Sequence, residues 1–85
     1  MSRVVFVGAD WCGPCKIMKA EGGAIQTLKA EGVDVEIIDA DTDEASMAKY
    51  GVRGLPTAIF LNSEDEEVSR LVGLKSLTQL KECLV

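Results

Sequence analysis

Cys12 and Cys15 are the residues whose type and spacing most directly indicate chemistry, because only Gly13 and Pro14 separate them. A zinc site, a structural disulfide and a reactive dithiol are all compatible with such a pair. A zinc site needs about four ligands. The chain has no histidine and only one further cysteine, Cys83, so a carboxylate or a second chain would have to complete the site. A structural disulfide would close too short a loop to stabilise the fold much, and a cytosolic setting would tend to reduce it.

A redox-active pair explains more of the local sequence. Apolar residues recur at helical spacing from Gly13 onward, and Pro14 falls in the first turn, so a helix is expected to begin at the cysteines. Cys12 then lies at the helix N-terminus, where N–H groups and the helix dipole lower a thiol pKa from about 8.5. Cys15 lies one turn further in, where it can attack a mixed disulfide formed by Cys12. Lys16 would add modest positive potential, which Asp10 opposes.

Pro56 is the second residue of interest, because it stands one position before the strand-like run TAIFL. A cis X-Pro bond is plausible there, since such bonds serve tight turns. A simple proline at the start of a strand is equally compatible with the sequence. The proline alone does not decide between these two interpretations.

Four strands must position these residues. RVVFV at 3–7 is a continuous β-branched and aromatic run, as expected of a strand covered on both faces. Further strands are predicted at 33–39, 57–61 and 67–72, the last two joined by the acidic turn NSEDE into an antiparallel hairpin.

Three helices are predicted between and after the strands. The first begins at Gly13 and ends at Gly32, with a bend or weak point at Gly22-Gly23. The second begins with a capping box of Asp41 and Glu44 and ends at Gly51, and the third begins with a capping box of Ser76 and Gln79. Leu77, Leu80 and Leu84 form the apolar face of this last helix.

The predicted order is β-α-β-α-β-β-α, an α/β fold with a mixed four-stranded sheet and helices on both faces. The 85 residues make one domain, 1–85. The net charge of −5, with acids clustered at 39–44 and 64–67, argues against nucleic-acid binding. Neither a membrane span nor a signal peptide is recognisable, so we expect a soluble, cytoplasmic protein.

Three segments together resemble the thioredoxin family over nearly the whole chain: WCGPCK at 11–16, YGVRGLPT at 50–57 and VGLKSLTQLKECL at 72–84. The resemblance implies a minimal thioredoxin fold. It also implies that Cys12 attacks, that Cys15 resolves, and that Pro56 is a cis-proline facing the disulfide. Trp11, Gly13, Pro14 and Lys16 complete the motif. The implied docking surface for target proteins consists of Trp11, Gly54, Leu55, Pro56, Val72, Gly73 and Leu74, with the Leu55 backbone pairing with the target.

The chain departs from the family pattern at informative positions. Thioredoxins begin with an extra strand and helix that are missing here. They also carry a buried aspartate and a lysine that assist proton transfer to the resolving cysteine, at the positions of Phe6 and Ile37. Losing both is coherent, because either charge alone would be buried and unpaired. We therefore expect solvent, or a group not identified from the sequence, to take the proton from Cys15.

Other departures concern packing. Ala20 replaces the helix-kinking proline of the family, and Gly8 replaces its second tryptophan. Cys83 is predicted to be a small buried hydrophobe, and Met18 and Met47 are predicted to fill the core.

The resemblance implies a protein disulfide reductase that acts by dithiol–disulfide exchange and binds no cofactor or metal. Electrons would come from NADPH through a thioredoxin reductase, and targets would be oxidised proteins such as ribonucleotide reductase. We expect a monomer. Two alternatives stay open: a glutathione-dependent, glutaredoxin-like reductase, and a non-catalytic module that binds proteins through the surface around Trp11, Leu55 and Leu74.

Overall fold

The computed structural model describes residues 3–84. Its elements in chain order are β1 (Arg3–Gly8), α1 (Gly13–Lys19), α2 (Ala24–Ala30), β2 (Asp34–Asp39), α3 (Glu44–Tyr50), β3 (Thr57–Leu61), β4 (Glu67–Val72) and α4 (Leu77–Glu82). The strands form one sheet in the order β2-β1-β3-β4. β1 runs parallel to β2 and antiparallel to β3, and β3 and β4 form the expected hairpin. The mixed four-stranded sheet predicted from the sequence is confirmed.

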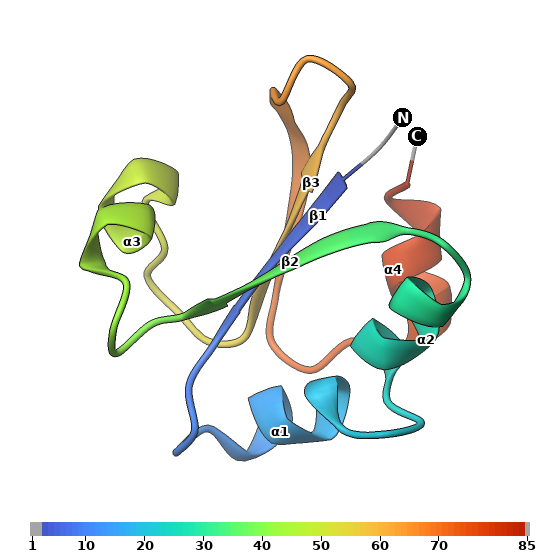
Figure 1. Ribbon diagram of the computed structural model, residues 1–85, viewed down its shortest axis with the longest axis horizontal. Coiled ribbons are helices and arrows are strands. Elements are labelled where there is room, and N and C mark those ends of the chain that lie inside the picture. Colours follow the sequence, from blue (N-terminus) through green and yellow to red (C-terminus); the bar gives the residue numbers. More distant parts are fainter. Residues whose placement is uncertain (1–2, 85) are drawn as a thin grey trace.

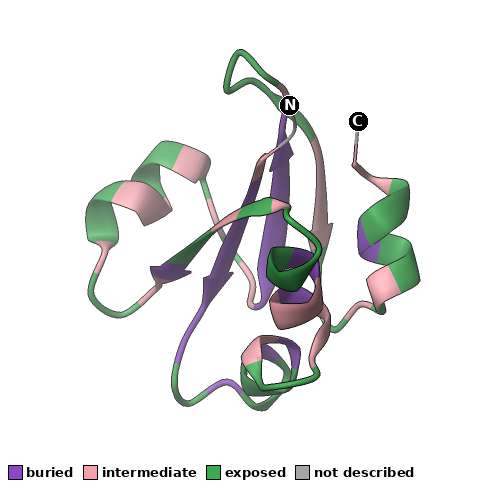
Figure 2. Cartoon of the chain, turned by 45° about the vertical axis from the view of Figure 1, so that its right-hand side comes forward, coloured by how far each residue is buried: buried purple, intermediate pink, exposed green. Residues whose placement is uncertain are grey.

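Strand β1 divides the hydrophobic core in two, because successive side chains point to opposite faces of a sheet. Val4 and Phe6 belong to a larger cluster that includes residues of α1, α2 and α4. Val5 and Val7 belong to a smaller cluster against which residues of α3 pack. Figure 1 shows this division, with α3 on one side of the sheet and the other three helices on the opposite side. The burial-coloured view shows the inner strands buried and the outer helix faces exposed (Figure 2).

The first predicted helix is two helices. α1 ends at Lys19 and α2 begins at Ala24, so the expected bend at Gly22-Gly23 is a complete break. Gly22 has a φ of +81°, a conformation that side chains disfavour. A Cβ on Gly23 would lie 2.4 Å from the Ile17 carbonyl oxygen. Both glycines are therefore required for the tight turn between the two helices.

The predicted start of α3 was wrong by two residues. The cap is Asp43, whose carboxylate accepts hydrogen bonds from the N–H and the hydroxyl of Ser46. Asp41 stands in the preceding turn, where its N–H donates to Asp39 Oδ1 at 2.9 Å. The predicted end at Gly51 is confirmed, since this residue caps the helix in the left-handed conformation.

The capping box that starts α4 is confirmed, with reciprocal hydrogen bonds between Ser76 and Gln79. Leu80 is fully buried, and Leu77 and Leu84 pack against the larger cluster, although α4 itself ends at Glu82. Over residues 3–84, we find no helix long and apolar enough to cross a membrane.

Candidate active site

Cys12 caps the N-terminus of α1, immediately after the turn that follows β1. Its N–H donates to the carbonyl oxygen of Ala9 at 3.1 Å, which closes this turn. Its sulfur accepts the N–H of Cys15 at 3.2 Å, in the place where a serine or aspartate oxygen usually caps a helix. Such a contact stabilises a thiolate, because a hydrogen bond to the charged form of a group favours that form.

The two cysteines form a disulfide, with their Cα atoms 5.2 Å apart. Cys12 has 6% of its surface exposed, whereas Cys15 is fully buried. Cys12 is therefore the sulfur that an incoming thiol or disulfide reaches first, and Cys15 is reached only through it. Attack by Cys12 and resolution by Cys15, the roles predicted from the sequence, would require this difference in access.

The end of β1 approaches Cys15 closely. A Cβ on Gly8 would lie 3.0 Å from Cys15 Cβ, 3.2 Å from its sulfur and 3.3 Å from Cε2 of Phe6. Gly8 is thus needed for the close approach of backbone and resolving cysteine. Phe6 is fully buried in the cluster that contains Cys15, so an aromatic ring occupies the position at which the family carries an acid.

Ile37 corrects one argument made from the sequence. Although Ile37 stands beside Phe6 in the parallel register, it is 39% exposed because β2 is an edge strand. A lysine at this position would reach water and would not be a buried unpaired charge. The argument from burial therefore holds for Phe6 alone.

A second loop lies at the same end of the sheet as the cysteines. Thr57, at the start of β3, pairs with Val7 of β1 on one side and with Val72 of β4 on the other. The Leu55–Pro56 peptide bond before it is cis, and Leu55 packs against the larger core cluster, which also holds both cysteines.

The segment after β4 is tied to this loop. The N–H of Gly73 donates to the Pro56 carbonyl oxygen at 2.8 Å, and a Cβ on Gly54 would lie 3.2 Å from Val72 Cγ1. The residues of the predicted docking surface that come from two separate segments, 54–56 and 72–74, thus lie together.

Exposed apolar side chains mark this end of the molecule. Trp11, Val72 and Leu74 are 68%, 52% and 54% exposed. Trp11 is held by Asp41, whose carboxylate oxygen Oδ2 accepts the indole N–H at 2.9 Å. This contact was not predicted, because Asp41 had been assigned to the cap of α3.

Ile17 was also missed, although it is 60% exposed. It lies on α1 at helical spacing from Gly13 and Pro14, both of which are exposed. The sequence assigned Ile17 to the apolar face of a long helix. Ile17 follows Pro14 by three residues, so the two side chains share one face of the helix. This spacing could have indicated from the sequence that Ile17 is exposed beside the cysteines.

The remaining candidates lie elsewhere. Lys16 is exposed on α1, and Met18 is buried in the core as predicted, while Met47 is half-buried against the smaller cluster. Cys83 is half-buried at the end of α4, with its sulfur 3.6 Å from the Ser69 hydroxyl, so it is less enclosed than predicted.

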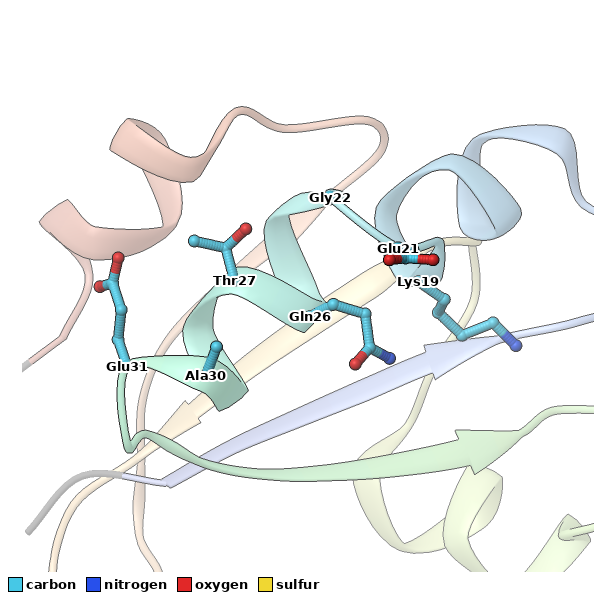
Figure 3. Close-up of a pocket in the computed structure, with 7 residues that line it drawn as sticks. All are labelled: Lys19, Glu21, Gly22, Gln26, Thr27, Ala30 and Glu31. Atoms are coloured by element: carbon cyan, nitrogen blue, oxygen red, sulfur yellow. The ribbon is translucent and has the colours of Figure 1, made fainter.

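Figure 3 shows an open hollow along α2 and the α1–α2 connection, lined by Lys19, Glu21, Gly22, Gln26, Thr27, Ala30 and Glu31. None of the predicted site residues lines it. Within the part of the chain that the structure describes, no group of three or more metal-ligating side chains is found.

Comparison with known proteins agrees with this geometry. The family model described as Thioredoxin matches residues 2–85. A thioredoxin of Chlamydia trachomatis is 38% identical over 74 residues, which are 85% of this chain and 69% of the relative. The protein disulfide-isomerase-like protein EhSep2 of Emiliania huxleyi is 37% identical over 76 residues, or 86% of this chain. The match spans only 34% of the length of EhSep2.

Solved structures agree as well. A mutant thioredoxin from Halobacterium salinarum superposes with a TM-score of 0.84 at 34% identity, covering 95% of this chain and 69% of that one. Fasciola hepatica thioredoxin gives a TM-score of 0.82 at 34% identity, covering 95% of this chain and 75% of that one. Fold and reactive pair together define a thiol–disulfide oxidoreductase domain. The chain belongs to the thioredoxin family, for which a thioredoxin reductase is the usual partner.

Proposed function

We propose that this chain is a protein disulfide reductase that carries electrons from a thioredoxin reductase, and ultimately from NADPH, to oxidised target proteins in the cytoplasm. Ribonucleotide reductase belongs to the class of targets proposed. The observation that carries the proposal is the asymmetric access to the pair: Cys12 is slightly exposed and accepts the Cys15 N–H, while Cys15 is buried.

The reaction starts from the reduced dithiol. The Cys12 thiolate attacks one sulfur of the target disulfide, so that a Cys12–target bond forms, the target S–S bond breaks and one target thiolate leaves. Cys15 loses its proton and attacks the Cys12 sulfur. The Cys12–Cys15 bond forms, and the second target thiolate leaves. Two electrons have passed to the target, and a reductase restores the dithiol.

The exposed apolar side chains support a protein as the substrate. Trp11, Val72 and Leu74 give a bound polypeptide apolar surface around Cys12. The Asp41 carboxylate holds the indole of Trp11 in place. A surface of this kind favours a polypeptide as substrate, because exposed apolar side chains that gather in one place mark sites of protein interaction.

Reduction of insulin disulfides tests the proposal. The chain is supplied either with NADPH and a thioredoxin reductase, or with NADPH, glutathione and glutathione reductase. Turnover in the first system with little in the second is expected. The reverse result would favour the glutaredoxin-like alternative, and no turnover in either system would favour a non-catalytic binding module.

A further inference from the structure

Strand β2 forms one edge of the sheet, and within residues 3–84 no strand pairs with its outer side. The unpaired N–H and C=O groups of an edge strand are a template for another extended chain. In Figure 1, β2 crosses in front of β1 as the outermost strand on its side. Its outer edge is therefore a potential interaction surface separate from the cysteines.

The register shows which groups face outward. The N–H of Ala40 donates to the Gly8 carbonyl oxygen at 2.8 Å, so Ala40 faces β1. Residues of a parallel strand alternate in the direction of their hydrogen bonds. Val35, Ile37 and Asp39 therefore direct their backbone groups to the free edge. The Asp39 carbonyl already accepts N–H groups from the α3 turn, which leaves Val35 and Ile37 as the available pairing positions.

The two faces of this edge differ in chemistry. Ile38 belongs to the core cluster beneath α3, so Asp34 and Glu36 lie on that same face. Both acids are exposed, and they stand about 6.6 Å apart along the strand. Glu36 Oε1 already accepts a hydrogen bond from Arg3 Nη1 at 3.2 Å, whereas Asp34 takes part in no ion pair within residues 3–84. Val35 and Ile37 lie on the opposite face, where Val35 packs against the larger cluster and Ile37 is 39% exposed.

A second copy of this edge is a poor partner. Two β2 strands paired side by side would bring Asp34 and Glu36 of each copy close together on one face, and like charges on paired strands are destabilising. Acidic residues alone would be adequate protection for the edge. An exposed isoleucine between them is not protective, because it adds apolar surface to the template.

We propose that the outer edge of β2 binds an extended segment of another polypeptide in which basic and aliphatic residues alternate. The added strand pairs with the backbone of Val35 and Ile37. On one face, a lysine or arginine of the added strand lies against Asp34, and a second shares the Glu36 carboxylate with Arg3. On the other face, its aliphatic side chains cover Ile37.

Two synthetic peptides test this proposal on the 85-residue chain. One is a capped peptide that alternates lysine and valine, and the other has the same composition with its lysines and valines in separate blocks. The alternating peptide should slow amide hydrogen exchange at Val35 and Ile37, measured by NMR, and the blocked peptide should not. Equal protection by both peptides would show that only unspecific charge attraction is involved, and it would overturn the proposal.

Charge reversal on the strand sharpens the test. Asp34→Lys should weaken binding of the alternating peptide by about fivefold. Glu64→Lys makes the same charge change in the exposed β3–β4 turn and should leave binding unaltered. Neither substitution should alter disulfide reduction.

Three further results would refute the proposal: slow exchange at Val35 and Ile37 before any peptide is added, protection that depends only on protein concentration, or peptide-induced shifts confined to the loop of Trp11 and Cys12.

Discussion

The indole N–H of Trp11 donates to the carboxylate of Asp41, which lies thirty residues further along the chain, with 2.9 Å between the nitrogen and Oδ2. The contact connects the loop of the cysteines to the turn after β2. It fixes the orientation of an aromatic side chain that is otherwise 68% exposed. One face of the surface around Cys12 is thus positioned by a residue outside the sequence motif.

Asp41→Ala should release this indole. Because the contact is exposed, we expect a loss of about 1 kcal/mol or less in the free energy of unfolding. Insulin reduction should slow, since the docking surface loses its fixed orientation. Trp11 is the only tryptophan, so its fluorescence reports the change directly. Asp41→Asn keeps an acceptor and should behave nearly as the unaltered chain. If Asp41→Ala has the same fluorescence and rate as the parent, the contact does not position Trp11.

The different access to the two sulfurs predicts different trapping behaviour. Cys15→Ser should accumulate covalent complexes with oxidised proteins, because Cys12 still attacks but no resolving thiol is present. Cys12→Ser should trap none, because the remaining sulfur is buried. Non-reducing electrophoresis followed by mass spectrometry measures the complexes and identifies the targets. Equal trapping by both variants would contradict the assigned roles.

Gly8→Ala should disturb Cys15 directly. The added methyl group would meet the Cys15 Cβ at 3.0 Å and its sulfur at 3.2 Å. Overpacking of this kind costs about 1–3 kcal/mol in the free energy of unfolding. Gly13→Ala is the matched control for stability alone, since its Cβ would meet nothing within 4 Å. Urea denaturation compares the two variants, and equal losses would show that the approach of Gly8 to Cys15 is not tight.

Phe6 is buried in the same cluster as the resolving Cys15, at the position where the family carries an acid. Burial among apolar groups disfavours the Cys15 thiolate, so the resolving step should accelerate steadily with pH through the neutral range. Phe6→Asp should add an inflection to this profile by placing a carboxyl group near Cys15, and should lower stability. Phe6→Leu controls for packing and should retain the original profile. A pH profile identical in all three proteins would remove the basis for this interpretation.

The cap of α3 predicts acid sensitivity. Hydrogen bonds from the Ser46 hydroxyl and N–H lower the pKa of Asp43 from its ordinary value of 3.8. The resulting stabilisation is complete above that ordinary value and is lost as the pH falls through the lower pKa of the folded state. Asp43→Asn keeps a capping oxygen and should weaken this acid dependence, whereas Asp43→Ala should lower stability at neutral pH as well. Thermal unfolding across the acid range measures both effects.

Local composition was sufficient to predict most of the fold. Runs such as RVVFV and TAIFL identify buried strands because β-branched and aromatic residues suit a covered sheet, and Ser76 with Gln79 defines a helix start through a specific pair of hydrogen bonds. The start of α3 was missed because two aspartates, Asp41 and Asp43, both precede the helix. Only the fold shows that Trp11 engages the first of them.

Tertiary structure decided the remaining features. The exposure of Ile37 follows from the edge position of β2, which strand composition cannot reveal. Ile17 lies on α1, before the break at Gly22-Gly23, and shares a face with the exposed Gly13 and Pro14, so the single apolar face assumed for one long helix does not exist. At the site itself, the cysteine spacing indicated the chemistry, while the close approach of Gly8 to Cys15 required three-dimensional information.

Both sulfurs of the reactive pair belong to the larger core cluster, together with Met18, Ile25 and Leu80. The folding equilibrium and the reduction equilibrium of the disulfide are therefore linked in one thermodynamic cycle. A substitution among these apolar neighbours that favours the folded oxidised form over the folded reduced form shifts the midpoint potential by the same free energy. For a two-electron couple, about 1.4 kcal/mol corresponds to about 30 mV. The packing of the larger core cluster thus helps to determine the reduction potential of the domain.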